Sequence, residues 1–184
     1  MLQINFTPFP ILTTDRLILR RITRDDAPEM FLMRSNPEVM KYINRPLQKS
    51  LEDTFQHIDM ITKLLDENEG INWGITLKGS EKIVGSILVF SFKKEHYRAE
   101  IGYILMEEFH KKGIMHEAMQ AVLKFAFETL QLHSLEANVN PDNFASIALL
   151  EKNDFIREAY FKEDFYWQGK FLDSAIYSLL APAK

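Results

Sequence analysis

The feature that most constrains the fold is a strand pattern, a helix pattern and a second strand pattern in direct succession. Residues 97–106 (YRAEIGYILM) read as a strand, and residues 134–140 (SLEANVN) form a second β-rich run. Between them, apolar residues recur every three to four positions over 115–130, which is typical of one face of a helix. Two strands joined by a crossover helix pair in parallel. The chain therefore predicts a sheet that includes a parallel pair.

The remaining segments add strands and helices on both sides of this unit. Strand patterns cover residues 15–22, 72–78, 82–92 and 155–180, the last as two strands around the turn WQGK. Helix patterns cover residues 23–35, 50–70 and 141–154. Ser50 and Asp53 have the spacing of a capping box, and Asn143 is a candidate N-cap. This order predicts a mixed α/β (α+β) fold, and because no linker or repeat is visible, a single domain over residues 1–184.

The composition argues against several classes of protein. A formal net charge of −4 disfavours a nucleic-acid binder, which needs a surplus of Lys and Arg. The chain has no cysteine, which removes disulfides, thiolate metal sites and a cysteine nucleophile. His110 and His116 do not share a helix face, so we expect no metal site. No run approaches the ~18 apolar residues of a membrane span and the N-terminus lacks a signal-peptide pattern, so we expect a cytoplasmic protein without a membrane partner.

The junction between the predicted strand and the predicted helix has the sequence FHKKGIMHEAM over residues 109–119. The start of a helix has up to four unpaired N–H groups and about half a positive charge, which suits an anion such as phosphate. Gly113 would let a phosphate approach the backbone, and Lys111 and Lys112 would add positive charge. The alternative is a tight turn at Gly113 with two solvated lysines.

Four blocks of the sequence follow one another in the order of a known family. They are TTDRLILRRIT at 13–23, AEIGYILMEEFHKKGIMHEAM at 99–119, LHSLEANVNPDNFASIALLEKNDF at 132–155 and GKFLDSAIYSLL at 169–180. With these blocks the chain resembles the GNAT superfamily of N-acetyltransferases, in particular the ribosomal-protein-alanine N-acetyltransferase (Rim-type) branch. The resemblance runs from about residue 12 to residue 180. It implies a mixed, mostly antiparallel twisted sheet that splays at its fourth and fifth strands, with helices on both faces and acetyl-CoA in the opening.

The resemblance implies a pyrophosphate-binding loop with the pattern Gln/Arg-x-x-Gly-x-Gly/Ala. The matching positions are His110, Lys111, Lys112, Gly113, Ile114 and Met115. The central glycine is present, whereas the first and last positions depart from the pattern. His110 can still donate a hydrogen bond where the family has Gln or Arg. Met115 replaces a very small residue, and its bulk is expected to tighten the phosphate cradle and to affect the affinity for the cofactor.

The resemblance also assigns residues around the reacting thioester. Main-chain groups of Ile104, Leu105 and Met106 are expected to pair with the pantetheine arm and to hold the thioester, as N–H donors in an oxyanion hole do. Asn143 and Ser146 match the family's Asn-x-x-Ser pattern. The Asn side chain is expected to face the cofactor arm and the Ser side chain to lie near the sulfur. Capping of the helix is a structural role that can coexist with this one.

Two side chains are candidates for the proton transfers of the reaction. Many members of the family place a tyrosine one helical turn further as the acid that reprotonates the leaving thiolate. The matching position here is Leu150, so Ser146 is the hypothesised donor. An amine acceptor must lose a proton before it attacks. Glu100 is the candidate base because the family often carries Glu at this site, and the alternative is a surface carboxylate paired with Lys or Arg.

Together these residues predict an acetyl-CoA-dependent N-acetyltransferase that acts by direct transfer in a ternary complex, since no cysteine is available for an acetyl-enzyme. The branch resemblance favours a protein N-terminal amine, such as that of a ribosomal protein, as the acceptor. The alternatives are a small amine, an amino acid or an antibiotic, and, in a different class, a non-catalytic acyl-CoA-binding regulatory module. Relatives are often dimers, so a homodimer is a further expectation from the resemblance.

Overall fold

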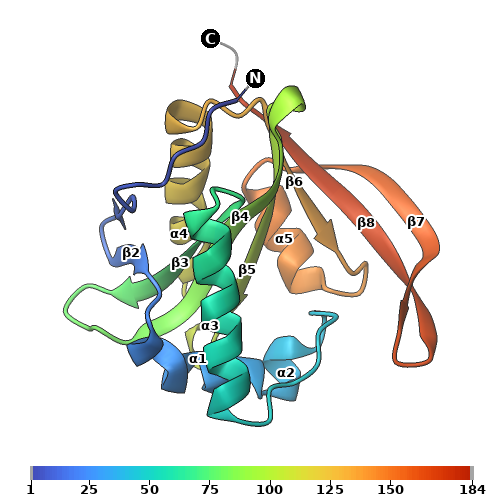
Figure 1. Ribbon diagram of the computed structural model, residues 1–184. Helices are drawn as coiled ribbons and strands as arrows, with labels where there is room; N and C mark the ends of the chain where they lie inside the picture. The colour runs from blue at the N-terminus through green and yellow to red at the C-terminus, as the bar shows by residue number, and fades with distance from the viewer. Residues whose placement is uncertain (1, 183–184) are drawn as a thin grey trace.

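The computed structural model describes residues 2–182 and contains an eight-stranded sheet with helices on both faces (Figure 1). The strands are β1 (Leu12–Thr13), β2 (Leu17–Arg21), β3 (Gly70–Leu77), β4 (Ile83–Lys93), β5 (Arg98–Leu105), β6 (Ser134–Val139), β7 (Ile156–Trp167) and β8 (Lys170–Leu180). The helices are α1 (Ala27–Arg34), α2 (Pro37–Met40), α3 (Leu51–Asp66), α4 (Ile114–Lys124) and α5 (Phe144–Lys152). Short 3₁₀ turns lie at Arg24–Asp26, Lys94–His96 and Glu107–Phe109. Within residues 2–182, none of the helices is long and apolar enough to span a lipid bilayer.

The sheet opens between β5 and β6. The strand order is β1-β2-β3-β4-β5-β6-β8-β7, and every neighbouring pair is antiparallel except β5 with β6. The parallel pair confirms the prediction from the crossover helix, but its register ends at Glu100 and Glu136. Beyond this point β5 follows β4 to Leu105, while β6 follows β8 to Val139. The predicted mixed sheet and its splay are confirmed. The splay was expected at the fourth and fifth strands, and these strands are numbered β5 and β6 here because the short strand β1 is also counted.

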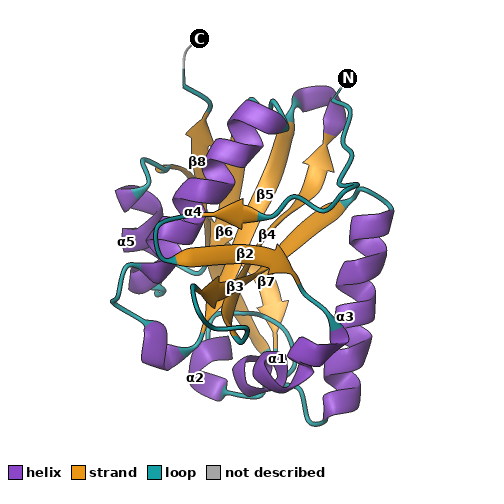
Figure 2. Ribbon diagram, turned by 90° about the vertical axis from the view of Figure 1, so that its left-hand side faces the viewer, coloured by secondary structure: helices purple, strands orange, loops and turns teal. Residues whose placement is uncertain are grey.

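Two apolar clusters cover the two faces of the sheet. The first contains Met119 of α4 together with Ile101 of β5. The second contains Met33 of α1 and Ile58 of α3 together with Ile104 of β5. Because successive side chains of a strand point to opposite faces, β5 contributes to both clusters. Figure 2 shows α4 and α3 on opposite sides of the sheet. A residue of β5 therefore faces either α4 or the α1 and α3 pair.

Local sequence signals set the ends of the two longest helices. The Ser50 hydroxyl accepts a hydrogen bond from the N–H of Asp53, and the Asp53 carboxylate accepts one from the N–H of Ser50, which confirms the predicted capping box. Helix α3 ends at Asp66, before the predicted end near Gly70, because Gly70 already begins β3. Helix α4 passes into a π-helical turn at Phe125–Thr129. The predicted helix over 115–130 is thus present, with a change of pitch at its end.

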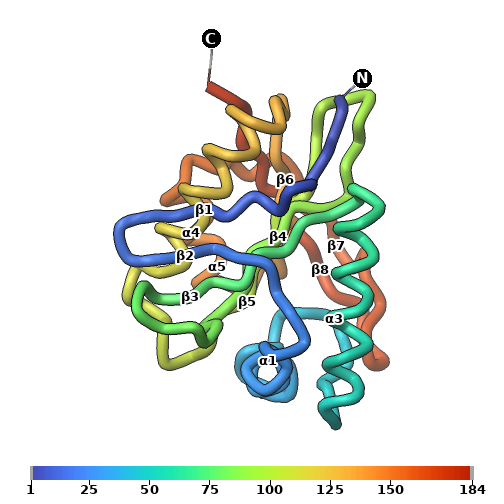
Figure 3. The backbone as a smooth tube through the Cα atoms, turned by 60° about the vertical axis from the view of Figure 1, so that its left-hand side comes forward, coloured from blue at the N-terminus to red at the C-terminus, as the bar shows by residue number. Residues whose placement is uncertain are grey.

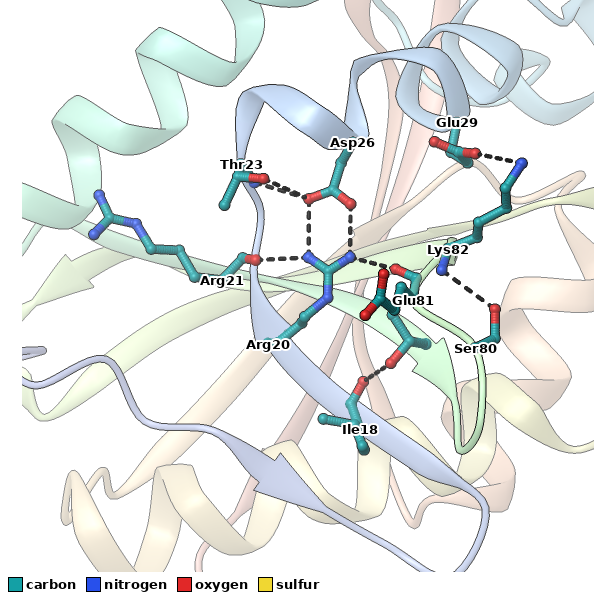
Figure 4. Close-up of polar contacts among 10 residues, drawn as sticks. Ile18, Arg20, Arg21, Thr23, Asp26, Glu29, Ser80, Glu81 and Lys82 are labelled. Carbon is teal, nitrogen blue, oxygen red and sulfur yellow. Dashed lines mark hydrogen bonds and ion pairs between the residues drawn. The ribbon is translucent and has the colours of Figure 1, made fainter.

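An ion pair fixes the start of α1 against the sheet (Figure 4). Arg20 donates two hydrogen bonds to the Asp26 carboxylate, at 2.9 and 2.7 Å, and others to the carbonyls of Arg21 and Glu81. Asp26 is buried and also accepts from the N–H of Thr23. A buried carboxylate needs such partners, because an unpaired charge in the interior is costly. The pair therefore sets the position of α1, which follows β2 at the foot of the sheet (Figure 3).

Candidate active site

The opening in the sheet begins at Glu100, the last residue of β5 that pairs with β6. Its side chain is half-buried and, by strand alternation, lies on the same face as Ile104, towards α1 and α3. Burial raises the pKa of Glu100 and the charge of Glu136 raises it further, while a hydrogen bond from Ser91 and the charge of Lys93 oppose the shift. No ion pair links Glu100 to a Lys or Arg among the described residues. The structure thus places at the edge of the opening a carboxylate that has a raised pKa and no ion-pair partner among the described residues.

A pair of hydroxyl groups bridges the opening. The phenol oxygen of Tyr103 on β5 lies 2.6 Å from Oγ of Ser146 in the first turn of α5. Burial raises the pKa of Tyr103 to about 12, although the hydrogen bond with Ser146 opposes this shift. The phenol is therefore protonated at neutral pH and can donate a hydrogen bond. Sequence reasoning did not single out Tyr103, because it looked for a tyrosine at Leu150, which is fully buried in the core.

Asn143 caps α5 and leaves part of its side chain for another partner. Its Oδ1 accepts a hydrogen bond from the N–H of Ser146 at 3.1 Å, which confirms the predicted N-cap. Its Nδ2 has no hydrogen-bond partner within residues 2–182. One amide can therefore hold the helix start with its oxygen and offer its N–H groups to a ligand in the opening.

The end of β5 offers only every second residue's backbone groups to the opening. The N–H of Met106 donates to the carbonyl of Val84 on β4, at 2.9 Å. In an antiparallel pair, the backbone groups of successive residues alternate between the two sides of the strand. Ile104 therefore faces β4 like Met106, whereas Tyr103 and Leu105 face the opening. Of the three residues expected to serve the cofactor, Leu105 thus directs its N–H to the opening, and the roles of Ile104, Leu105 and Met106 stay predictions.

The turn before α4 has the geometry of an anion cradle. Gly113 is the N-cap of α4 and has a φ of 75°, in the left-handed region that favours glycine. Lys111 also has a positive φ, of 59°. The side chains of Lys111 and Lys112 are exposed. The first turn of α4 therefore presents its N–H groups beside a residue without a Cβ and two cationic side chains.

The two residues that depart from the family's loop pattern leave this cradle open. Met115 is 7% exposed and packs in the core beneath α4, so its side chain does not enter the loop. The expectation of a cradle tightened by its bulk is not supported by this position. Nε2 of His110 lies 3.0 Å from the carbonyl oxygen of Leu105. His110 thereby ties the start of the loop to the end of β5.

Arg16 is a component of the loop that sequence reasoning missed. Its Nε lies 2.6 Å from Oε2 of Glu117 in the first turn of α4, and its Nη1 donates to the carbonyl of Lys112 at 3.1 Å. A Cβ on Gly113 would meet the guanidinium of Arg16 at 3.4 Å. Glu117 by itself would repel an anion at the helix start, and Arg16 compensates its charge. The partners are about a hundred positions apart in the chain, so no local pattern reveals them.

Comparison with known proteins decides the family. Residues 16–156 match the acetyltransferase (GNAT) domain. The chain belongs to the GNAT family. This GNAT protein is 37% identical over 174 residues to the uncharacterized N-acetyltransferase YoaA of Bacillus subtilis (strain 168). The aligned region covers 95% of this chain and 98% of YoaA. It is 23% identical over 179 residues to the [ribosomal protein uS5]-alanine N-acetyltransferase of Escherichia coli (strain K12). Here the aligned region covers 93% of this chain and 91% of that protein.

The GNAT fold also matches in three dimensions. The ribosomal L7/L12 α-N-protein acetyltransferase RimL, solved in complex with coenzyme A, superposes with a TM-score of 0.85 over 95% of this chain and 100% of that chain, at 22% identity. The family, the fold and the class of enzyme expected from the sequence, an N-acetyltransferase, are thus confirmed. Within the described residues, no group of three or more His, Asp or Glu side chains could hold a metal ion.

Proposed function

We propose that this N-acetyltransferase moves an acetyl group from acetyl-CoA to a primary amine in the opening between β5 and β6. One observation carries the proposal. At and just beyond the point where it loses β6, strand β5 presents Glu100 on one face and Tyr103, hydrogen-bonded to Ser146, on the other. An amine and a thioester that meet at this strand would have a base on one side and a proton donor on the other.

The loop before α4 is proposed to bind the pyrophosphate of acetyl-CoA. Its N–H groups and the positive φ of Gly113 suit a phosphate, Lys111 and Lys112 add positive charge, and Arg16 neutralises Glu117. The N–H of Leu105 faces the opening and would donate to the thioester carbonyl, whose oxygen gains negative charge in the transition state. The Nδ2 of Asn143 would bind the pantetheine arm. All these groups belong to one edge of the opening or to the helix starts that flank it.

The chemistry removes two protons from the acceptor ammonium and delivers one to the leaving thiolate, around one substitution at the acetyl carbon. Glu100 accepts a proton from the ammonium form of the acceptor, and its raised pKa suits this role near neutral pH. The amine nitrogen then bonds to the acetyl carbonyl carbon, and the carbon–sulfur bond breaks. The Ser146 hydroxyl, hydrogen-bonded to Tyr103, gives its proton to the departing thiolate. The nitrogen loses its second proton on becoming an amide nitrogen, and this proton returns to the Tyr103–Ser146 pair, so that both hydroxyls are protonated again. The absence of cysteine in the chain supports direct transfer in a ternary complex, because the most common acetyl-enzyme nucleophile is not available.

The acceptor that we favour is the N-terminal amine of a protein, in the cytoplasm. The support is the similarity to the uS5-alanine N-acetyltransferase, which extends over most of both chains. A small amine or an amino acid is the rival acceptor. A non-catalytic acyl-CoA-binding module is the rival from another class, but it gives no reason for a carboxylate with a raised pKa beside the opening.

Calorimetric titration with acetyl-CoA, followed by a thiol-release assay against a panel of peptides and amines, tests the proposal. We expect binding together with release of CoA that depends on one class of acceptor. Binding without thiol release from any acceptor would favour the non-catalytic module. Absence of binding would contradict the role given to the Gly113 loop.

A further inference from the structure

Arg34, the last residue of α1, is a half-buried arginine without a carboxylate partner. Its Nε is buried and makes no hydrogen bond, and no ion pair of its guanidinium is found among residues 2–182. Elsewhere in the chain, Arg20 and Arg98 meet Asp26 and Glu136 at 2.7 Å. A charge removed from water is costly unless it is paired. The unpaired guanidinium is therefore available to an anionic group from outside the chain.

The neighbours of Arg34 add positive charge instead of cancelling it. Burial lowers the pKa of Arg34, and the charge of Arg45 lowers it further. Burial and the charge of Arg34 lower the pKa of His57 on α3 to about 4, so His57 is neutral at pH 7. Arg34, Arg45 and His57 thus form a cluster, called here the Arg34 cluster, with a net positive charge at neutral pH.

The Arg34 cluster is held in place by the segment that follows α2. The N–H of Gln48 donates to the carbonyl of Arg34 at 3.0 Å. The side chain of Gln48 accepts from the Thr54 hydroxyl at 2.7 Å and reaches the carbonyl of Asp53 in α3. These bonds connect the end of α1, the segment of Arg45 and the first turns of α3. The backbone that carries Arg34 and the first turns of α3 is therefore connected before a ligand arrives, which lowers the entropy cost of binding.

The Arg34 cluster lies on the face from which the acceptor would approach. Met33 and Ile58, next to Arg34 and His57 in the chain, pack in one apolar cluster with Ile104 and Met106 at the end of β5. This is also the face to which Glu100 points. In Figure 1, α2 and the segment after it lie below the opening, between the base of α3 and the β7–β8 hairpin. The Gly113 loop, by contrast, precedes α4 on the other face, so the phosphates of the cofactor have a separate site.

We propose that the acceptor amine carries a carboxylate and that Arg34 binds it. This inference rests on the proposed acetyl transfer and names the chemistry of its acceptor. A guanidinium pairs with a carboxylate through two parallel hydrogen bonds, which fixes orientation as well as affinity. A polyamine would meet repulsion at the same place. The carboxylate belongs either to an acidic side chain near the N-terminus of a peptide or to a free amino acid.

Two matched pairs of acceptors test the inference and separate the two sources. The first pair is a C-terminally amidated hexapeptide with Glu at its second position and the same peptide with Gln. The second pair is alanine and alaninamide. Acetyl transfer is measured by thiol release, and binding is measured by calorimetry in the presence of CoA. The proteins are wild type, Arg34→Gln, and the control Arg24→Gln, whose exposed arginine pairs with Asp59 of α3.

We expect the wild type to prefer the carboxylate-bearing member of one pair by about tenfold or more, in binding and in kcat/KM. Arg34→Gln should abolish this preference, mainly through KM and without a loss of thermal stability, whereas Arg24→Gln should retain it. Equal use of both members by the wild type, or an unchanged preference in Arg34→Gln, would overturn the inference. Because binding is measured separately, a preference in binding without thiol release would contradict the proposed function alone. Transfer without a preference would contradict the carboxylate site alone.

Discussion

The phenol oxygen of Tyr103 lies 2.6 Å from Oγ of Ser146 and joins β5 to α5 across the opening of the sheet. The two hydroxyls form a chain in which the phenol can donate to the serine while the serine donates to the leaving thiolate. In the proposed mechanism this arrangement takes the role of the tyrosine that the family resemblance led us to look for at Leu150. In this GNAT protein Leu150 is fully buried, and the phenol beside the Ser146 hydroxyl of α5 comes from strand β5.

Removal of either hydroxyl should slow the reaction. We expect Tyr103→Phe and Ser146→Ala each to lower kcat by about ten- to hundredfold, because proton donation of this kind contributes at least that much. Since the two groups act as one unit, the double variant should be no slower than the slower single variant. Steady-state kinetics of thiol release measures this. Tyr166→Phe, on the exposed β7–β8 hairpin, is the control, and additive losses in the double variant would contradict a joint role.

Replacement of Glu100 should remove one limb of the pH profile. The base must be ionised to act, and its pKa is raised by burial and by Glu136, so the wild-type rate should rise with pH through that raised pKa. We expect Glu100→Gln to lower kcat by about a hundredfold and to lose this dependence. The measurement is kcat as a function of pH for both proteins, with Glu95→Gln as an exposed control. An unchanged profile in Glu100→Gln would rule out the role of base.

The same substitution should not weaken the fold. A carboxylate whose pKa is raised on folding destabilises the folded state once pH rises above its ordinary value, because the unfolded chain ionises first. Glu100→Gln removes this effect, so its free energy of unfolding at pH 7 should equal or exceed that of the wild type. Denaturant unfolding checks this. A clear loss of stability at pH 7 would indicate that Glu100 has a structural role.

Gly113→Ala separates cofactor binding from backbone strain. The φ of 75° at Gly113 costs a non-glycine residue about 1 kcal/mol, and the added Cβ would also lie at the mouth of the proposed phosphate site. We expect the KM for acetyl-CoA to rise about tenfold. Gly169→Ala is a matched control, since Gly169 has a φ of 83° and open space around it in the β7–β8 turn. The two variants could instead lose similar stability and show a similar rise in the KM for acetyl-CoA. That result would argue against the assignment of the Gly113 loop to phosphate binding.

His57 should make the fold sensitive to mild acid. Its pKa is lowered from 6.5 to about 4 by burial and by the charge of Arg34, so protonation favours the unfolded chain. Stability should be full above pH 6.5 and fall as pH decreases towards 4, by about 2 kcal/mol at pH 5 from this residue. We expect His57→Gln to lose this part of the acid sensitivity, as measured by urea unfolding at pH 7 and pH 5. An equal loss in both proteins would place the titrating group elsewhere.

The elements that the sequence predicted are those that depend on local patterns. The capping box at Ser50, the N-cap at Asn143 and the crossover helix between β5 and β6 follow from spacing within a few residues, and all three are present. The parallel pairing followed from a topological rule instead of from pairing preferences. The family itself rested on blocks of residues in a fixed order.

The parts of the site that the sequence did not predict depend on contacts between distant segments. Tyr103 meets Ser146 through the splay of two strands, and Arg16 meets Glu117 across about a hundred positions. The burial of Met115 depends on how α4 rotates against the sheet, which its identity alone does not reveal. The unpaired charge of Arg34 is defined by the absence of a neighbour within the described residues, and only three-dimensional packing can show this.

Direct acetyl transfer at β5 is best tested by an initial-velocity study in which acetyl-CoA and the acceptor amine are varied together. Direct transfer with Glu100 and the Tyr103–Ser146 pair on opposite faces of β5 requires both substrates to be bound at once. It predicts reciprocal plots that intersect. Parallel plots would mean that the acetyl group is first transferred to the protein, and they would contradict direct transfer in a ternary complex.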